Sequence, residues 1–155
     1  MNLAEIIDAR AIIPQLKAQN KKHLLQEVSQ AVAPILAVDH RIVFESLLTR
    51  EKLGSTGLGQ GIAIPHGRLS NITRVYGLFA RLATAIAYDS VDGEPVDLVF
   101  VLLSPAQAGA DHLKALARIS RLLREPDTMK KLRGTESAEG LYAILTEPTA
   151  TATAA

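Results

Sequence analysis

The residues with the clearest potential for chemistry lie in one stretch between Arg50 and Arg68. Four glycines within eight residues, at positions 54, 57, 59 and 61, precede the sequence Pro65-His66-Gly67. Glycine lets backbone N–H groups approach a ligand, and such a loop can form a concave anion site. The spacing fits neither a Walker loop nor the dinucleotide fingerprint, which opens a helix after a strand. The glycines alone are equally compatible with a structural turn.

His66 is the strongest candidate for a reacting group. It follows the short apolar run Ile62-Ala-Ile64 and stands between a rigid proline and a permissive glycine, so we expect its imidazole at a strand end. Ligand sites of α/β proteins tend to lie at strand ends. A neutral imidazole nitrogen is a nucleophile near pH 7 and can form a covalent intermediate. The competing interpretation is a histidine in a turn with satisfied hydrogen bonds.

His112 and Arg50 are the two further candidates. Asp111 is expected to cap a helix with His112 in its first turn, where the helix dipole favours an anion and a neutral imidazole. Arg50 ends a helix directly before the glycines, and a guanidinium there can hold a phosphoryl group through two parallel hydrogen bonds. The alternatives are an exposed histidine at a helix start and an arginine that offsets the dipole at a helix end. Arg68 and Arg81 are weaker candidates of the same kind.

Metal and hydrolase chemistry find little support. His66, His112 and a carboxylate such as Asp111 have the right atoms for zinc, but no local spacing such as His-x-x-x-His accompanies them. Ser55 or Thr56 beside a histidine would suggest a hydrolase, yet the Gly-x-Ser-x-Gly elbow is missing. The absence of cysteine excludes disulfides, thiolate ligands and thiol nucleophiles.

The elements that must position these residues alternate between strand and helix patterns. Apolar runs predict strands, and 3.6-residue spacing with caps at Asn20 and Asp39 predicts helices. The predicted strands are 11–16, 62–64, 75–82 and the central 97–103. The first is expected at a sheet edge, because Pro14 has no N–H to donate to a neighbouring strand. The predicted helices are 20–36, 39–53, 111–123, a short one around 129–132, and 138–145. In the helix at 111–123, the core-facing residues are predicted to be Leu113, Leu116, Ala117, Ser120 and Leu123. We expect a three-layer αβα sandwich with a mixed sheet, forming a single domain over 1–147, and a disordered tail over 148–155.

Composition narrows the class of protein further. In 155 residues, 17 Lys and Arg balance 16 Asp and Glu, and aromatic residues are only 4%. A protein that binds nucleic acid would usually show a basic face and aromatic platforms, so no nucleic-acid partner is expected. The longest uncharged run, 98–110, is shorter than the roughly 18 apolar residues that span a bilayer, and the N-terminal residues do not read as a signal peptide. We therefore expect a soluble cytoplasmic protein without membrane insertion.

The stretch Leu47-Leu-Thr-Arg50-Glu-Lys-Leu-Gly-Ser-Thr-Gly-Leu-Gly-Gln-Gly-Ile-Ala-Ile-Pro-His66-Gly closely resembles the enzyme IIA domain of the bacterial phosphotransferase system, mannitol/fructose type. Residues 91–105, Asp111-His112-Leu and 137–142 also resemble this family. The likeness covers about residues 3–147, and the Ile-Pro-His-Gly motif is specific. Within the family, the stand-alone nitrogen-regulatory IIA proteins are the most similar.

The resemblance implies that His66 accepts a phosphoryl group, that His112 lies beside it and that Arg50 lines the same pocket. The donor would be a phosphohistidine on an HPr-like carrier, which an enzyme I homologue charges from phosphoenolpyruvate, and no cofactor or metal is needed. The residues expected to surround the phosphoryl group are Gly54, Ser55, Thr56, Gly57, Gly59, Gly61 and Gly67.

Three functions remain open from the sequence. The first is a regulatory phosphoryl carrier that controls partner proteins through its phosphorylation state. The second is a sugar-specific IIA that passes phosphate onward in fructose or mannitol uptake. Because this chain has neither a cysteine nor a membrane span, that relay would need a separate IIB and a separate membrane protein. The third is a non-catalytic binding module that uses His66 only structurally.

Overall fold

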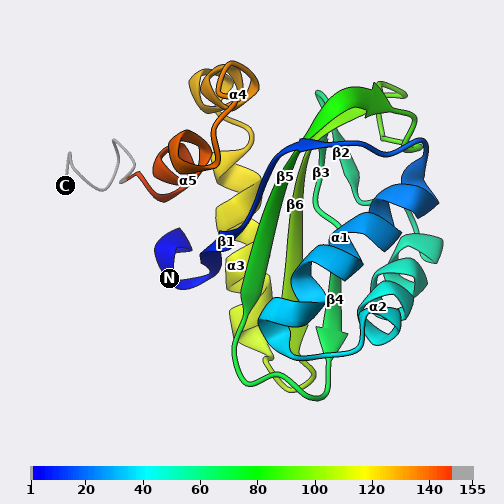
Figure 1. Ribbon diagram of the computed structural model, residues 1–155. Helices are drawn as coiled ribbons and strands as arrows, with labels where there is room; N and C mark the ends of the chain where they lie inside the picture. Colours follow the sequence, from blue (N-terminus) through cyan, green and yellow to red (C-terminus); the bar gives the residue numbers. More distant parts are fainter. Residues whose placement is uncertain (1, 148–155) are drawn as a thin grey trace.

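A computed structural model describes residues 2–147, in which a six-stranded mixed sheet lies between two groups of helices (Figure 1). The strands are β1 (Ile7–Leu16), β2 (Gly57–Gly59), β3 (Ile62–Ala63), β4 (His66–Leu69), β5 (Tyr76–Ile86) and β6 (Val96–Pro105). The helices are the short 3₁₀ turn η1 (Leu3–Glu5), α1 (Lys21–Leu36), α2 (His40–Lys52), α3 (Ala110–Leu122), α4 (Pro126–Arg133) and α5 (Ala138–Thr146). The layered α/β architecture expected from the sequence is confirmed. The tail predicted for 148–155 lies outside the described residues.

Strand β6 organises the sheet and fixes the position of His66. The strand order is β1-β5-β6-β3-β2, so β1 is an edge strand, and β4 also pairs with β6. Strands β3 and β4 lie one after the other along β6, both parallel to it, with Ile62 opposite Leu98 and His66 opposite Leu102. Between them, the carbonyl of Pro65 accepts a hydrogen bond from the Leu102 N–H at 2.9 Å. His66 is therefore the first residue of a strand anchored to the most buried part of the sheet.

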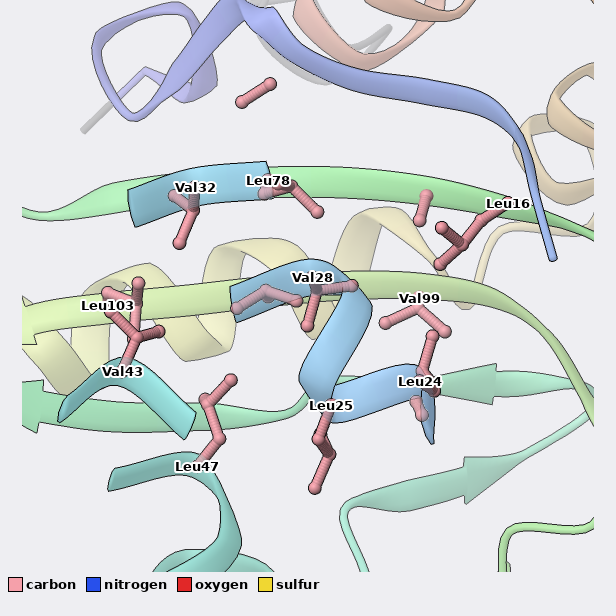
Figure 2. Close-up of a cluster of buried hydrophobic side chains, with 14 of the residues drawn as sticks. Leu16, Leu24, Leu25, Val28, Val32, Val43, Leu47, Leu78, Val99 and Leu103 are labelled. Atoms are coloured by element: carbon pink, nitrogen blue, oxygen red, sulfur yellow. The ribbon is translucent and has the colours of Figure 1, made fainter. Parts of the chain in front are cut away.

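Helices α1 and α2 cover one face of the sheet. The side chains of Asn20 and Asp39 cap these two helices as expected, and α1 ends at Leu36, two residues after the proline of its last turn. Figure 2 shows how the apolar side chains of both helices meet those of the strands. Members of this core cluster include Leu16, Leu24, Leu25, Val28, Val32, Val43, Leu47, Leu78, Val99 and Leu103. This packing fixes α2, and with it Arg50, against the strands that lead to His66.

Helices α3, α4 and α5 cover the other face, and the sequence prediction for α3 needs two corrections. The helix is capped by Gly109, whose φ is +57°, and Asp111 lies in the first turn. Its buried residues are His112, Ala115, Ile119 and Leu122. Of the five residues predicted to face the core, only Leu123, directly after the helix, is fully buried. The helix carries apolar residues on two adjacent stripes, and tertiary packing buries the stripe that continues from His112. Leu113 is 65% exposed.

Among the described residues, no helix has both the length and the apolar character needed to cross a bilayer.

Candidate functional site

Two hydrogen bonds on its ring nitrogens hold His66 in one orientation. Its Nδ1 lies 2.8 Å from the carbonyl oxygen of Ile64, and because a carbonyl only accepts, Nδ1 must carry the proton. The other nitrogen, Nε2, then has a free lone pair, and the Nε–H of Arg50 donates to it at 3.1 Å. Burial of the ring lowers the pKa of His66, and the Ile64 hydrogen bond offsets part of this effect. The charge of Arg50 lowers the pKa by less than the Ile64 hydrogen bond raises it, and the charge of Glu51 raises it least. The neutral, nucleophilic form is therefore favoured near pH 7.

Arg50 reaches His66 because helix α2 packs closely on strand β4. At Gly67 an added Cβ would collide with the hydroxyl of Ser46, so only glycine permits this approach. The Ser46 hydroxyl donates to the carbonyl of Arg68 at 3.0 Å and ties the helix to the strand. The guanidinium of Arg50 is held at its other side by the Gly54 carbonyl, which accepts from Nη1 at 2.8 Å. Arg50 is thus a fixed cation beside the free nitrogen of His66.

His112 lies next to His66, as expected, with the two ring centroids 5.5 Å apart. Its side chain is buried, and its Nδ1 is 2.6 Å from the hydroxyl of Ser104, which is also buried. Burial, together with the charge of Arg68 and the proximity of His66, lowers the pKa of His112 to about 4. When the Ser104 hydroxyl donates to Nδ1, the proton of the neutral ring is on Nε2. His112 then offers a neutral N–H donor.

The depressed pKa of His112 predicts a measurable effect of acid on folding. An unfolded chain binds this proton below a pH of about 6.5, whereas the folded protein excludes it down to about pH 4. The unfolding free energy should therefore fall as the pH drops through this window. His112→Gln should flatten that dependence when urea unfolding is measured at pH 7 and pH 5. His40→Gln, which removes an exposed imidazole, is the matched control, and equal slopes in both variants would contradict the prediction.

Arg50, His66 and His112 meet at a surface pocket of about 580 Å³. Its walls also include Gly67 and Arg68. The Nη1 of Arg68 donates to the carbonyl of Ala106 at 3.3 Å, which leaves its charge close to the pocket. A smaller pocket of about 230 Å³ shares Arg50 and His66 and extends along Leu58 and Leu116. A nucleophilic nitrogen, two guanidinium groups and a neutral histidine are suited to a dianionic phosphoryl group.

The glycine-rich segment does not present a row of free N–H groups to this pocket. The N–H of Gly54 donates to the Glu51 carbonyl at 3.2 Å, that of Thr56 to the Glu51 carboxylate at 2.9 Å, and that of Gly57 to the Ser55 hydroxyl at 3.1 Å. Ser55 and Thr56 line the smaller pocket with His66. Gly54 contacts Arg50 directly, and Thr56 contacts Ile64, whose carbonyl accepts from His66.

The last two glycines of the segment belong to the hairpin between β2 and β3. At Gly59 an added Cβ would approach Asp92, and at Gly61, where φ is +83°, it would collide with Arg133. Arg81 is also remote from the pocket, because it donates to the carbonyls of Arg133 and Pro14. The structure therefore brings together His66, His112, Arg50, Gly67 and the start of the loop, but not Gly59, Gly61 or Arg81.

Two buried polar residues of the site escaped the sequence analysis. Ser104 contacts His112 across eight residues, and Glu51 contacts Thr56 behind the loop. Neither contact has a local spacing that would predict it. Within residues 2–147, no group of three or more His, Asp or Glu side chains is arranged to hold a metal ion.

Comparisons with known proteins identify the family of the chain. Residues 5–147 match the family model described as "Phosphoenolpyruvate-dependent sugar phosphotransferase system, EIIA 2". The chain is 52% identical over 152 residues to the nitrogen regulatory protein of Bradyrhizobium diazoefficiens. The aligned residues make up 98% of this chain and 99% of that protein.

Two examples represent the solved structures that share this fold. One is the nitrogen regulatory protein IIA-Ntr from Neisseria meningitidis, with a TM-score of 0.88 and 38% identity over 93% of this chain and 99% of that one. The other is IIA mannitol from Escherichia coli, with a TM-score of 0.76 and 20% identity over 89% and 97% of the two chains. The first is similar in sequence as well as in fold, and the second in fold alone.

Proposed function

The chain belongs to the EIIA 2 family of the phosphoenolpyruvate-dependent sugar phosphotransferase system and is a phosphoryl-transfer component of that system; we propose that it is a regulatory phosphoryl carrier of a nitrogen-related branch. In this proposal an HPr-like phosphocarrier, charged from phosphoenolpyruvate through an enzyme I homologue, phosphorylates His66 in the cytoplasm. The phosphorylation state then controls the binding of target proteins. The observation that carries the proposal is the unprotonated Nε2 of His66 facing the guanidinium of Arg50.

The reacting atom in this proposal is Nε2 of His66. Its lone pair attacks the phosphorus of the donor phosphohistidine, the new N–P bond forms as the donor's N–P bond breaks, and the donor imidazole leaves with the electron pair. No proton is transferred in the step, because Nδ1 of His66 keeps its hydrogen. The Ile64 carbonyl, 2.8 Å from Nδ1, stabilises the positive charge that develops on the ring. The ring nitrogen that becomes phosphorylated is therefore Nε2.

Arg50 and His112 neutralise the charge of the transferred group. As the N–P bond forms, the lone pair of Nε2 is no longer available, so the Nε–H of Arg50 transfers its hydrogen bond to a phosphoryl oxygen. A neutral His112, 5.5 Å away between ring centroids, donates to another oxygen. Transfer between two histidines changes bond energies little, so positioning and charge stabilisation account for the catalysis. The product carries about two more negative charges at this surface, enough to change which partners bind.

Exposed apolar side chains around the two pockets fit a protein donor. Ile42 and Leu53 line the larger pocket, and Leu58 lines the smaller one. All three are exposed, Leu53 by 82%. A donor histidine can reach Nε2 of His66 only if the carrier covers this surface. Burying one leucine against a partner contributes about 1.5–3 kcal/mol.

Leu53→Ser should therefore weaken the recognition of the carrier. We expect the KM for the phosphorylated carrier to rise by about tenfold while the kcat stays near that of the wild type, because the substitution removes apolar surface without adding a charge to the pocket. Val91→Ser is the matched control, since Val91 is 85% exposed and lines neither pocket. Initial rates over a range of carrier concentrations give both constants. Equal KM values for the two variants would mean that the exposed apolar side chains around the pockets do not bind the carrier.

Reconstitution tests the function itself. The protein is incubated with phosphoenolpyruvate, enzyme I and an HPr-like carrier, and the phosphate is located by mass spectrometry after neutral and acidic treatment. An acid-labile phosphate on His66 is expected. Its absence would favour the non-catalytic binding module. Rapid onward transfer to a sugar-specific IIB would favour the sugar-transport function over the regulatory one.

A further inference from the structure

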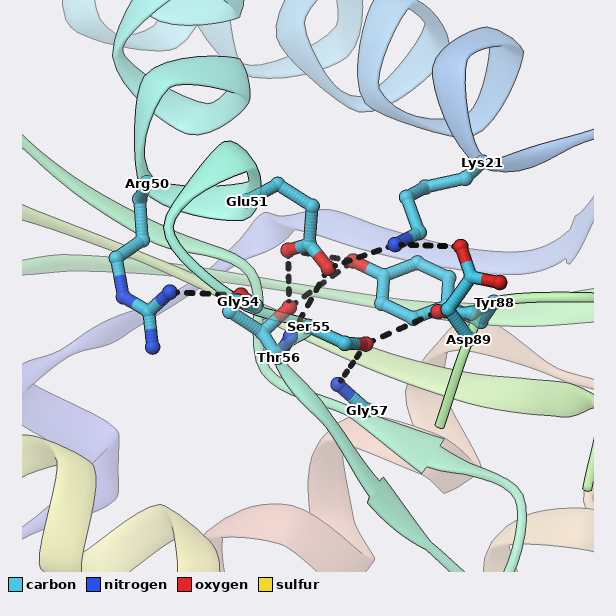
Figure 3. Close-up of polar contacts among 9 residues, drawn as sticks. All are labelled: Lys21, Arg50, Glu51, Gly54, Ser55, Thr56, Gly57, Tyr88 and Asp89. Atoms are coloured by element: carbon cyan, nitrogen blue, oxygen red, sulfur yellow. Dashed lines mark hydrogen bonds and ion pairs between the residues drawn. The ribbon is translucent and has the colours of Figure 1, made fainter. Parts of the chain in front are cut away.

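Behind the site lies a buried carboxylate, that of Glu51, next to Arg50 in the chain. Its side chain is only 3% exposed, yet it is surrounded by donors (Figure 3). The Thr56 N–H and hydroxyl donate to its two oxygens at 2.9 and 2.6 Å. Lys21 lies 3.1 Å from one oxygen, and the Tyr88 hydroxyl 3.4 Å from the other. A buried carboxylate is tolerated only when it is paired and hydrogen-bonded in this way.

One chain of contacts leads from Glu51 to the nucleophile. The Glu51 carboxylate accepts from both donors of Thr56, its N–H and its hydroxyl, and the carbonyl of Thr56 accepts from the N–H of Ile64 at 3.1 Å. The carbonyl of that same Ile64 accepts from Nδ1 of His66. Ile64, whose carbonyl keeps the proton on Nδ1, is thus held through its own N–H by a residue that the carboxylate fixes. A shift of Thr56 moves the acceptor on which the orientation of the His66 ring depends.

A second chain of contacts leads from Glu51 to the cation. The backbone carbonyl of Glu51 accepts the N–H of Gly54, and the carbonyl of Gly54 accepts from Nη1 of Arg50. The short segment between Gly54 and Thr56 is therefore held at one end by the backbone of Glu51 and at the other by its carboxylate. Its position determines where the guanidinium of Arg50 lies relative to His66.

We infer that Glu51 is a positioning residue for the transfer reaction, acting through Thr56 and Gly54 on His66 and Arg50. The inference rests on the proposed function for its kinetic consequence, but its geometric content is independent of it. The carboxylate is buried and lines neither pocket, so its effect on the reaction is indirect. It sets the separation and orientation of Nε2 and the guanidinium, and a misplacement of about 1 Å between reacting groups can cost on the order of 100-fold in rate.

The alternative is that this cluster only stabilises the fold. The half-buried pair of Asp97 and Arg133 provides the comparison, because Arg133 donates to both oxygens of Asp97 at 2.9 Å. Asp97 is near the start of β6, whereas His66 pairs with Leu102 five residues later, about 17 Å along a strand. Asp97→Asn therefore weakens a similar cluster without touching the site.

The decisive experiment compares Glu51→Gln, Thr56→Val, Thr56→Ser and Asp97→Asn. We expect Glu51→Gln to lower the kcat for phosphorylation about 10- to 100-fold and Thr56→Val by a smaller factor, with the KM for the carrier unchanged within about twofold. Thr56→Ser keeps the hydroxyl and should restore the wild-type rate. Asp97→Asn should lose stability but keep its kcat. The ¹⁵N NMR shifts of the His66 ring should change in Glu51→Gln and Thr56→Val and in neither of the other two variants.

The outcomes separate this inference from the proposed function. Wild-type rates and wild-type His66 shifts in both Glu51→Gln and Thr56→Val would overturn it. If Glu51→Gln does not fold, the inference is tested by comparing the rates and the His66 shifts of Thr56→Val with those of Thr56→Ser. If the wild-type protein accepts no phosphate, the proposed function fails, while the NMR comparison still tests whether Glu51 positions His66.

Discussion

Replacing His66 with alanine should abolish the acceptance of phosphate while the protein stays folded. The variant lacks the imidazole whose unprotonated nitrogen accepts the hydrogen bond of Arg50 in the larger pocket. The lost side chain is half-buried and hydrogen-bonds to Ile64 and Arg50. At about 0.5–1.5 kcal/mol for each hydrogen bond, the cost in stability should be about 1–3 kcal/mol. Intact-mass spectrometry after incubation with the charged carrier measures acceptance, and circular dichroism with thermal unfolding measures the fold.

His112→Gln provides the contrast to this variant. It keeps a donor and an acceptor beside His66, so it should still accept phosphate, and the phosphate should map to His66 alone. His112→Ala removes the donor and should be slower. Phosphate on His112, or retention of an acid-labile phosphate in His66→Ala, would contradict the assignment of the nucleophile.

The wild-type protein should still accept phosphate below pH 6.5, because burial and Arg50 lower the pKa of His66.

Much of the fold could be predicted from the sequence because its strongest elements carry local signals. The predicted caps Asn20 and Asp39 each accept a hydrogen bond from the first turn of their helix, as their residue types indicate. The central strand β6 is buried over nearly all its length, which its continuous apolar run indicates. The short strands β2 and β4 were not predicted, because pairing with β3 and β6 creates them and their own residues, rich in glycine, have little strand preference.

The face of α3 shows where local periodicity is insufficient. Leu113 and Leu116 were predicted to point inward because they recur at helical spacing. In the structure Leu113 is largely exposed, whereas Leu116 packs at the edge of the core and also lines the smaller pocket. Apolar residues at a binding surface follow the same spacing as core residues, so a single sequence cannot distinguish the two stripes. His112 belongs to the buried stripe, and this brings it beside His66.

The same limit applies to the site. His66, His112 and Arg50 could be identified because each has a chemically informative type at an element boundary. The contacts that control them, Ser104 to His112 and Glu51 to Thr56, join residues whose relation depends on how the strands pair. The glycines suggested a cradle of N–H groups, but several of these donors are already used within the chain. Their partners could not be found by spacing alone.

Substitution of Arg50 should slow phosphorylation without changing its site. Loss of one well-placed charged donor typically costs about 2–4 kcal/mol of transition-state stabilisation, so Arg50→Ala should reduce the kcat by a factor of about 30 to 1,000. Arg50→Lys keeps the charge but loses the planar fork that contacts both Gly54 and His66, so its rate should fall between those of alanine and wild type. Stopped-time assays at saturating carrier measure the kcat, and Arg41→Ala, in the same helix but exposed, is the control.

An NMR titration of His66 separates the two contributions of Arg50. Its positive charge lowers the pKa of His66, because a nearby cation disfavours the protonated ring. Removing the charge in Arg50→Ala should therefore raise this pKa toward 6.5, and acceptance should be lost at a higher pH than in the wild type. Arg50→Lys should shift it less, since the charge remains. A slow Arg50→Lys variant with a wild-type pKa would show that geometry, and not charge alone, determines the rate. Wild-type rates in both variants would instead mean that Arg50 only stabilises the end of its helix.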